Sequence, residues 1–316
     1  MNKLARIYRR FRLGKGYKHQ YRCHADFSLI RHKEDLDIVW KNEIVATVPH
    51  ASTLKNKFNN SCFTVATGPS LKDVDLTQSS QHDSISLNCA IKKFKEKKLA
   101  PTHCLIIDRA VFENDWQCIK DSVLSGANCF FSYVGLSRIC ETEPELFKKG
   151  NIYLIEGIGR QFGIARPSRE EFREKYDGDD DIFVDTSFPQ DRGAMGFSCD
   201  VGKGVFTGKT VATWAVQLAY YLGYKNNFIA GMDLGGTGQS YFYNNGNNAP
   251  PNFLANYEPV IRVSFEQTRR ASEQRGFSVY NLSEHSSLPD KIIPKISYAE
   301  ALVLADNYAG SKSITD

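Results

Sequence analysis

The sequence lacks the features that mark membrane, secreted and disulfide-rich proteins. No apolar run approaches the ~20 residues needed to cross a bilayer, and the N-terminus has neither the apolar segment nor the cleavage site of a secretory signal. The eight cysteines form no C-x-x-C pair and several lie in apolar runs, so we expect reduced core thiols rather than disulfides or zinc ligands. These absences predict a globular protein of the cytosol.

Several catalytic and metal-binding motifs are also missing. The seven histidines form no H-x-x-x-H pair, and the chain contains no G-x-S-x-G elbow. The stretch VGKGVFTGKT, residues 201–210, has Lys203 where a P-loop requires glycine, so we do not expect a P-loop nucleotidase. The acidic run at 177–181 could be a D-x-D metal site, but no apolar segment directly before it would fix the carboxylates, which favours a solvated loop. We therefore expect no metal site.

Negative charge is missing from the start of the chain. No acidic residue precedes Asp26, whereas eight of the 40 basic residues lie within positions 1–22. Without these eight, 32 basic residues face 36 acidic ones, so the net charge of +4 belongs to the N-terminal segment. Its apolar residues recur at helical spacing, which suits either an amphipathic segment on anionic lipid or a solvated basic tail. We do not expect nucleic-acid binding, because no basic stripe with interleaved aromatic residues continues beyond this segment.

Beyond residue 60, short β-rich runs alternate with longer amphipathic ones. This alternation predicts an α/β domain whose mostly parallel sheet is covered by helices on both faces. The expected strands are 63–67, 84–88, 102–108, 127–134, 151–156, 227–232 and 277–282. The expected helices are 89–98, 110–124, 138–148, 210–222 and 264–275.

We divide the chain into a basic N-terminal extension (1–60), the α/β domain (61–295) and a C-terminal tail (296–316). Within the domain, residues 157–209 interrupt the alternation of strands and helices with several glycines. A glycine-rich stretch of this length inside an α/β domain is more often a functional loop than a linker. We expect a lid or acceptor-binding insertion there.

The stretch FTVATGPSLKDVDL, residues 63–76, predicts a buried strand, a tight turn and a helical turn. Gly68 permits unusual backbone conformations, Pro69 suits the first position of a helix or turn, and Ser70 can cap exposed amides. Such turns can direct backbone N–H groups at an anion, commonly a phosphate. An ordinary strand-to-helix connection without a ligand is the alternative.

Polar residues end several of the expected strands. They are Thr67 with Gly68, then Asn88, Asp108 and Asp233. Ligands of parallel sheets bind outside the carboxyl ends of the strands, so this set predicts a binding site. Thr210 opens the helix 210–222, whose N-terminal amides can hold a phosphate.

Three separated segments resemble one family. They are ATGPSLKDVD with SISLNCA, then TGKTVATWAVQLAYYLGYKNNFIAGMDLGGTGQSYFY, and finally FSVYNLSEHSSLP. In that order they resemble the bacterial WaaZ/RfaZ-like transferases that add a third 3-deoxy-D-manno-oct-2-ulosonic acid (Kdo) to lipopolysaccharide. More distantly they resemble the CMP-sialic-acid-dependent bacterial sialyltransferases. The likeness covers residues 63 to about 295 and is strongest over 197–295.

The resemblance implies a single Rossmann-like α/β domain in a GT-A-like variant. It also implies a metal-independent glycosyltransferase that transfers Kdo from CMP-Kdo to the lipopolysaccharide inner core or a related surface glycan. CMP-Kdo is then a donor substrate, and no cofactor is implied. The implied location is the bacterial cytoplasm, or the cytoplasmic face of the inner membrane with residues 1–22 on anionic lipid. Nucleic acid is not an implied partner.

Family roles can be placed on matching positions of this chain. The expected donor-binding residues are Thr67, Gly68, Pro69, Ser70, Asn88, Asp108, Gly208, Thr210 and Ser240. Tyr241 matches a hydroxyl on the leaving phosphate. By location, Glu258 is the leading candidate for the general base, with Asp233 and His285 as alternatives.

Two departures distinguish the chain from the sialyltransferases. It has Thr67 where they have asparagine, and it has no histidine over 258–264, where they have their base. These departures weaken a sialic-acid interpretation, so a sialyltransferase is the runner-up. A catalytically silent nucleotide-binding or glycolipid-binding relative is the alternative from another class.

Overall fold

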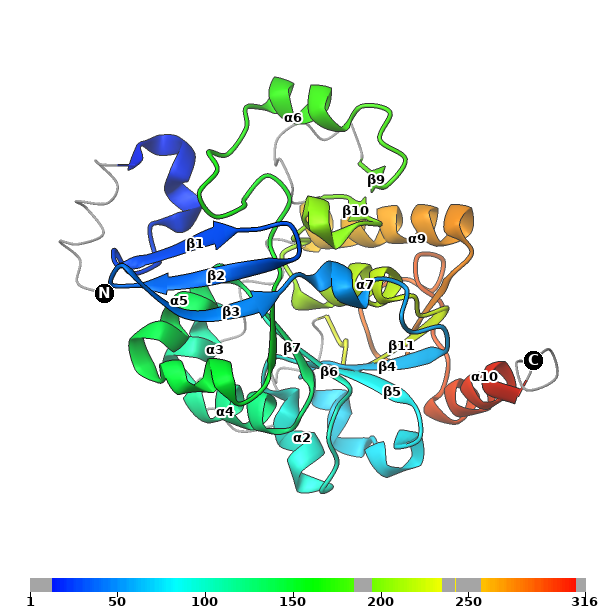
Figure 1. The fold of residues 1–316 in the computed structure, drawn as a ribbon. Coiled ribbons are helices and arrows are strands. Elements are labelled where there is room, and N and C mark those ends of the chain that lie inside the picture. The colour runs from blue at the N-terminus through cyan, green and yellow to red at the C-terminus, as the bar shows by residue number, and fades with distance from the viewer. Residues whose placement is uncertain (1–12, 185–194, 235–241, 243–256, 311–316) are drawn as a thin grey trace.

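A computed structural model describes residues 13–184, 195–234, 242 and 257–310. Its central sheet lies between two layers of helices (Figure 1). A small antiparallel sheet is formed by the first three strands of the described chain. Residues 1–12, the start of the basic segment, lie outside the described residues.

The central sheet has seven strands in the order β12-β11-β4-β5-β6-β7-β8, and every neighbouring pair is parallel. Each strand overlaps one of the seven expected from the sequence, so the prediction of a Rossmann-like parallel sheet is confirmed. The strands are β4 (Ser61–Val65), β5 (Asp83–Leu87), β6 (His103–Ile106), β7 (Asn128–Phe131), β8 (Asn151–Leu154), β11 (Asn226–Ala230) and β12 (Ser278–Asn281).

Both faces of this sheet are covered, as β7 illustrates. Cys129 and Phe131 belong to one apolar cluster with α4 (Trp116–Leu124) and α5 (Tyr133–Thr142), while Phe130 between them belongs to a cluster with α7 (Val211–Leu222). Because successive strand residues face opposite sides, burial on both faces requires a continuous apolar run. This requirement explains why the strands were recognisable in the sequence.

The helices follow the predicted positions with two breaks. The expected helix 110–124 is divided into α3 (Arg109–Asn114) and α4 by Asp115, whose φ of −128° and ψ of 48° are not helical. The expected helix 138–148 is observed as α5, which begins earlier than expected, at Tyr133, within the expected strand 127–134. It ends at Thr142, because a proline disfavours the helical conformation of the residue before it and Pro144 follows Glu143. The remaining expected helices are α2 (Ile91–Glu96), α7 and α9 (Val263–Arg275).

The segment treated as an extension contains a second sheet. It is antiparallel and consists of β1 (Phe27–Arg31), β2 (Asp35–Trp40) and β3 (Glu43–Pro49). Its apolar side chains Phe27, Leu36, Ile38 and Val48 lie in the same core cluster as α4 and α5. Lys41 and Asn42 form the turn between β2 and β3 with positive φ at both positions, which matches a two-residue hairpin turn. Residues 27–49 therefore pack as part of the α/β domain.

Two further segments contain elements that the sequence analysis did not place. The glycine-rich insertion includes α6 (Arg169–Tyr176) and the short pair β9 (Ile182–Phe183) and β10 (Phe197–Ser198), and Figure 1 shows α6 at the top of the molecule, above the antiparallel sheet. In the C-terminal segment, α10 (Tyr298–Gly310) packs Ala301 and Ala305 against Phe63 of β4.

The cysteines require one correction. Cys89 and Cys118 form a disulfide between the turn after β5 and α4, with 5.5 Å between their Cα atoms, so the expectation of eight reduced thiols is wrong for this pair. The other six are free and buried. Sequence spacing could not reveal the pair because tertiary folding alone brings together two residues that are 29 positions apart.

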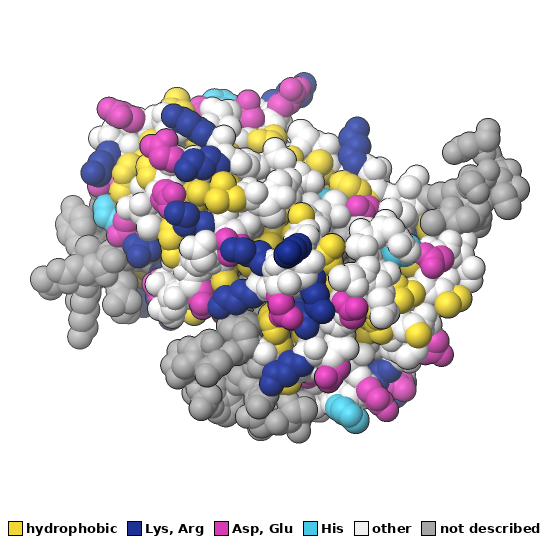
Figure 2. Space-filling model, turned by 90° about the horizontal axis from the view of Figure 1, so that it is seen from below, with side chains coloured by type: hydrophobic (Ala, Val, Ile, Leu, Met, Phe, Trp, Pro, Cys, Tyr) yellow, Lys and Arg dark blue, Asp and Glu magenta, His cyan; other side chains and the backbone are white. Residues whose placement is uncertain are grey.

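The lengths of the helices and the distribution of surface charge test two expectations, about membrane spans and about nucleic-acid binding. Within the described residues, every helix is too short or too polar to span a bilayer. Figure 2 shows Lys and Arg side chains interspersed with Asp and Glu over the face that points downward in Figure 1. The described part of this face therefore has no continuous basic stripe of the kind that tracks a nucleic-acid backbone.

Candidate functional site

The sheet order reverses between β4 and β11. From β4 the chain adds β5, β6, β7 and β8 on one side, then returns to place β11 and β12 on the other. In open α/β sheets the connections diverge at such a reversal, which leaves a crevice outside the carboxyl ends of the two strands. The residues that follow β4 and β11 are therefore the structural candidates for a binding site.

These two segments are bonded to each other. The Gly68 amide donates to the Gly231 carbonyl over 2.9 Å, and the Ser70 amide donates to Oδ2 of Asp233 over 2.9 Å. Asp233 is 6% exposed, so this hydrogen bond satisfies part of a buried carboxylate. The structure therefore places Asp233 beside the turn 67–70, and the carboxylate holds the start of that turn.

Gly68 is required for a reason different from the one expected. Its φ of −67° and ψ of 162° are open to any residue, so the turn does not need an unusual backbone conformation there. A Cβ at Gly68 would instead overlap Oδ2 of Asp233 and the carbonyl oxygen of Gly231. Pro69 opens the short 3-10 turn Pro69–Asp73, as expected for a residue with fixed φ.

The turn after β12 completes this junction. Ser283 Oγ and Ser70 Oγ are 3.0 Å apart, and the Ser287 amide donates to the Asp233 carbonyl over 3.2 Å. His285 lies between Ser283 and Ser287 in sequence, and its side chain is exposed. Three segments that end neighbouring strands thus meet here, and His285 is carried by one of them.

Asn88, after β5, has two unusual properties. It is a non-glycine residue with a φ of +49°, and its Oδ1 is buried without a hydrogen-bond partner in the described structure. Unfavourable backbone conformations and unpaired buried polar atoms both cost free energy and concentrate at functional sites. Asp108, after β6, is exposed and accepts a hydrogen bond from the Ala110 amide over 2.9 Å, so its observed role is to cap α3.

The loop before α7 is tightly constrained. Thr210 caps the helix by accepting from the Ala212 amide over 3.4 Å, and Gly208 has a φ of +50° where a Cβ would overlap Thr213. Oγ1 of Thr207 is buried without a described partner. The N-terminal end of this 12-residue helix and the unpaired Thr207 hydroxyl in the loop before it are therefore groups that suit an anion.

Gln217 is a buried residue that the sequence analysis missed. Its Oε1 accepts from the amides of Ser198 and Phe206, and its Nε2 donates to the carbonyls of Phe206 and Thr213. The side chain thus anchors the glycine-rich segment to α7. A glutamine within an apolar helical stripe was the available signal, because a buried amide requires partners.

Three of the predicted residues fall at the edge of what the structure describes. Ser240 and Tyr241 lie outside the described residues. Glu258 lies in the π-helical turn Tyr257–Arg262 that leads into α9, and its side chain is not described. The amide of Phe242 donates to the Thr67 carbonyl over 2.9 Å, so the described residue after Tyr241 contacts the turn that follows β4.

Two carboxylates of the acidic run 177–181 form ion pairs with one lysine. Nζ of Lys203 lies 2.7 Å and 2.8 Å from the two carboxylate oxygens of Asp179, and 2.9 Å from Oδ2 of Asp181. The hydrogen bond with Asp179, followed by that with Asp181, raises the pKa of Lys203 above its usual range. Within the described residues, the sole group of potential metal ligands is Cys89, Asp115 and Cys118, whose two thiols form the disulfide.

Comparison with known proteins identifies a sequence family and solved structures of similar fold, two of which are described below. The model of the family described as 3-deoxy-D-manno-octulosonic acid transferase WaaZ matches residues 45–299. A search of curated proteins found no match.

The two solved structures resemble the chain weakly. The Maf glycosyltransferase from Magnetospirillum magneticum AMB-1 aligns at 13% identity and a TM-score of 0.46, over 76% of this chain and 34% of that one. This chain thus spans about a third of that protein. The sialyltransferase CST-II, solved with a trisaccharide acceptor and CMP, aligns at 15% identity and a TM-score of 0.39, over 74% of this chain and 84% of that one.

Proposed function

The chain belongs to the WaaZ family of 3-deoxy-D-manno-octulosonic acid transferases, and from this membership we propose that it transfers Kdo from CMP-Kdo to the lipopolysaccharide inner core or a related surface glycan. It is thus a glycosyltransferase by family. The observation that carries the proposed site is the junction of Ser70 with Asp233 at the reversal of the strand order. This junction shapes the crevice in which a nucleotide donor is expected.

In the proposed reaction, an acceptor hydroxyl attacks the anomeric carbon of Kdo. The new bond joins the acceptor oxygen to that carbon, the bond from the carbon to the phosphate oxygen breaks, and CMP leaves with the bonding electrons. The hydroxyl proton passes to a general base. CMP carries less charge than a nucleoside diphosphate, so amides and hydroxyls can stabilise its departure without a metal ion.

The chain's own residues divide this work. The first turn of α7, capped by Thr210, holds the phosphate of CMP, and the unpaired Oδ1 of Asn88 accepts a hydrogen bond from the donor. Tyr241 donates to the leaving phosphate. Asp233 positions the turn 67–70 through the Ser70 amide, which leaves Glu258 and the exposed His285 as the candidates for the base.

A donor screen tests this proposal. CMP release is measured with CMP-Kdo and with CMP-sialic acid, each with and without purified inner-core lipopolysaccharide. We expect release from CMP-Kdo that the acceptor accelerates, and Asn88→Ala should weaken CMP binding in calorimetry. Acceptor-dependent release from CMP-sialic acid alone would establish the sialyltransferase instead. Binding of CMP without turnover of either donor would establish a silent nucleotide-binding relative.

A further inference from the structure

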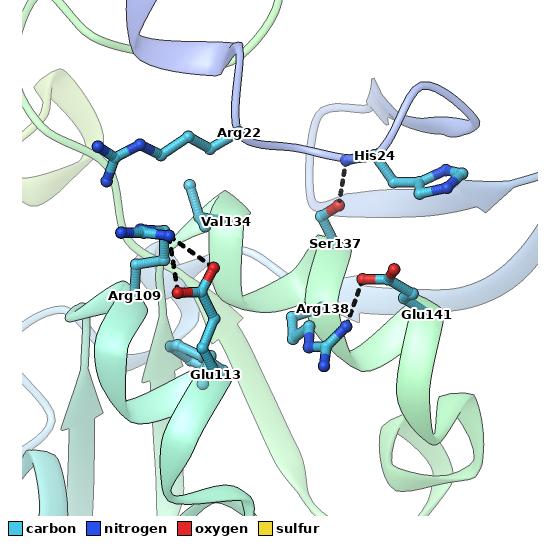
Figure 3. Close-up of a pocket in the computed structure, with 9 residues that line it drawn as sticks. Arg22, His24, Arg109, Glu113, Val134, Ser137, Arg138 and Glu141 are labelled. Atoms are coloured by element: carbon cyan, nitrogen blue, oxygen red, sulfur yellow. Dashed lines mark hydrogen bonds and ion pairs between the residues drawn. The ribbon is translucent and has the colours of Figure 1, made fainter. Parts of the chain in front are cut away.

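A cleft of about 220 Å³ lies between the segment before β1 and the helices α3 and α5, which follow β6 and β7, and it contains three arginines from three parts of the chain. Arg22 comes from the segment before β1, Arg109 opens α3 and Arg138 lies on α5. Figure 3 shows the Arg22 side chain extending above Arg109, and Arg138 turned toward Glu141. We call this the arginine cleft, and its complete lining is Arg22, His24, Arg109, Phe112, Glu113, Val134, Ser137, Arg138 and Glu141.

The cleft has an excess of positive charge. Arg109 is bound to both carboxylate oxygens of Glu113, at 2.6 Å and 2.7 Å, and Arg138 to Oε2 of Glu141 at 2.6 Å. Arg22 has no hydrogen bond or ion pair with any described residue. Three guanidinium groups therefore face two carboxylates, which leaves one cation for an anionic ligand.

The two ion pairs leave part of each arginine unsatisfied. Nε of Arg109 and Nε of Arg138 are buried without a hydrogen-bond partner in the described structure. A buried donor without a partner costs roughly 1–3 kcal/mol, more when it is charged. Because both Nε atoms are covered in this conformation, a bound carboxylate or phosphate would accept from them only after the guanidinium groups turn, and guanidinium groups match both anions through paired hydrogen bonds.

The existing pairs are also weak enough to rearrange. The side chains of Arg109 and Glu113 are 37% and 43% exposed, and those of Arg138 and Glu141 are 36% and 32% exposed. Ion pairs at such exposure contribute about 0–1 kcal/mol. An incoming anion can therefore replace or share the glutamates without a large cost.

A second cleft differs from the arginine cleft in the burial of its acidic residues. It has a volume of about 370 Å³ and also contains basic residues, but two of them already have buried or bonded acidic partners. Arg31 binds Glu156, which is 8% exposed, and His32 lies 2.8 Å from Asp37. Burial raises the pKa of Glu156, and Arg31 offsets part of that effect. The acidic partners in the arginine cleft differ in being exposed, at 43% for Glu113 and 32% for Glu141, so an external anion can displace them more readily than the buried Glu156.

The position of the arginine cleft links it to the proposed reaction. Arg109 directly follows Asp108, which lies between β6 and α3 and belongs to the predicted donor-binding residues. The Arg109 end of the cleft is therefore the part nearest the carboxyl edge of the sheet, on which the donor residues also lie. Arg22 additionally brings the last cation of the basic segment 1–22 to this edge.

We propose that the arginine cleft binds an anionic sugar of the acceptor glycan through a carboxylate or phosphate on that sugar. This proposal rests on the proposed function, which supplies the glycan acceptor. Arg22 and Arg138 are its principal positioning residues, and Glu141 competes with the ligand for Arg138.

The test uses full-length protein and deacylated inner-core saccharide. We expect Arg22→Gln and Arg138→Gln each to weaken saccharide binding by about tenfold or more in calorimetry, because each removes a charged donor. Both should raise the acceptor KM while the affinity for CMP changes less than twofold. Arg269→Gln is the matched control, since Arg269 has a similar exposed pair with Glu273 on α9 and does not line the cleft.

The direction of the affinity change in a second variant distinguishes a ligand-binding role of Arg138 from a purely structural one. Glu141→Gln should strengthen saccharide binding, because it removes a competing carboxylate, whereas a purely structural pair would make Glu141→Gln and Arg138→Gln equally harmful. Saccharide that has been dephosphorylated, and saccharide whose carboxyl groups have been reduced, distinguish the two anion sources. Unchanged affinity in Arg22→Gln and Arg138→Gln overturns the proposal. Because binding is measured without a donor, this outcome is distinct from a failure of Kdo transfer.

Discussion

Asp233 accepts a hydrogen bond from the Ser70 amide over 2.9 Å, although 163 positions separate the two residues in the chain. The bond crosses the point at which the strand order reverses, from the segment after β11 to the turn after β4. It ties together the two walls of the proposed donor crevice. The geometry of the turn 67–70 therefore depends on this carboxylate.

Asp233→Asn and Asp233→Ala should have different consequences. Asparagine retains an oxygen that can accept from Ser70, so we expect CMP affinity within threefold of the wild-type value. Alanine leaves the Ser70 amide unpaired at a cost of about 1–3 kcal/mol, so we expect a melting temperature a few degrees lower and CMP affinity at least tenfold weaker. Calorimetry and thermal unfolding measure both effects. Equal CMP affinity in Asp233→Ala and the wild-type protein would refute the positioning role, and normal binding with lost turnover in Asp233→Asn would identify Asp233 as the base.

Gly68→Ala should destabilise the protein through the same junction. The added methyl group overlaps Asp233 and the Gly231 carbonyl, so we expect a loss of roughly 1–3 kcal/mol in the free energy of unfolding together with weaker CMP binding. Gly157→Ala is the control, because a Cβ there meets nothing closer than 3.4 Å. The double variant Gly68→Ala with Asp233→Ala should lose less than the sum of the single variants, since one overlap is relieved. Additive losses would contradict this account.

The sequence predicted the strands of the central sheet because burial on two faces imposes a continuous apolar run. It also predicted which polar residues share an edge, since the carboxyl ends of parallel strands lie on one side of a sheet. It did not predict the pairing of Ser70 with Asp233, because strand order determines which ends are neighbours and periodicity does not encode that order. The hairpin at Lys41 and Asn42 was missed for a different reason, since its two-residue turn contains no glycine and β3, which follows the turn, is largely exposed.

Turnover should persist in excess EDTA. Lys203 already neutralises Asp179 and Asp181, so these carboxylates are not free to hold a divalent cation. Asp179→Asn with Asp181→Asn should leave kcat within twofold while lowering the melting temperature, because Lys203 loses its partners. CMP release is followed before and after chelation. Activity that is lost on chelation and restored by magnesium or manganese would show that the reaction needs a metal.

Stability should fall between pH 6.5 and pH 4 because of His103. Burial lowers the pKa of this fully buried histidine from 6.5 to about 4, with Asp83 acting weakly in the opposite direction. In this interval the unfolded chain binds a proton that the folded protein refuses, so the free energy of unfolding decreases as pH falls, by on the order of 3 kcal/mol. Thermal unfolding measured across this range checks the slope.

His103→Gln is the control for this effect. Glutamine can still bond the Tyr224 hydroxyl, which lies 2.9 Å from the histidine ring, but it does not titrate. We expect a flatter dependence on pH in the variant. Burial also lowers the pKa of His19, which gives a slope of the same sign in both proteins, so the difference between them isolates His103. Identical slopes would contradict the assignment.

The basic N-terminal segment should bind anionic membranes through its first 12 residues. Within residues 13–22 the contacts are to the protein itself, since Gln20 donates to the carbonyls of Gln161 and Ile164 and Arg22 lines the arginine cleft. Deletion of residues 2–12 should therefore reduce sedimentation with anionic vesicles, because it removes five of the eight cations. The rate of CMP release with a soluble acceptor should stay within twofold of the full-length value. Deletion that extends through Arg22 should also lower the affinity for the acceptor. Equal sedimentation of the full-length and shortened proteins would rule out a membrane role for this segment.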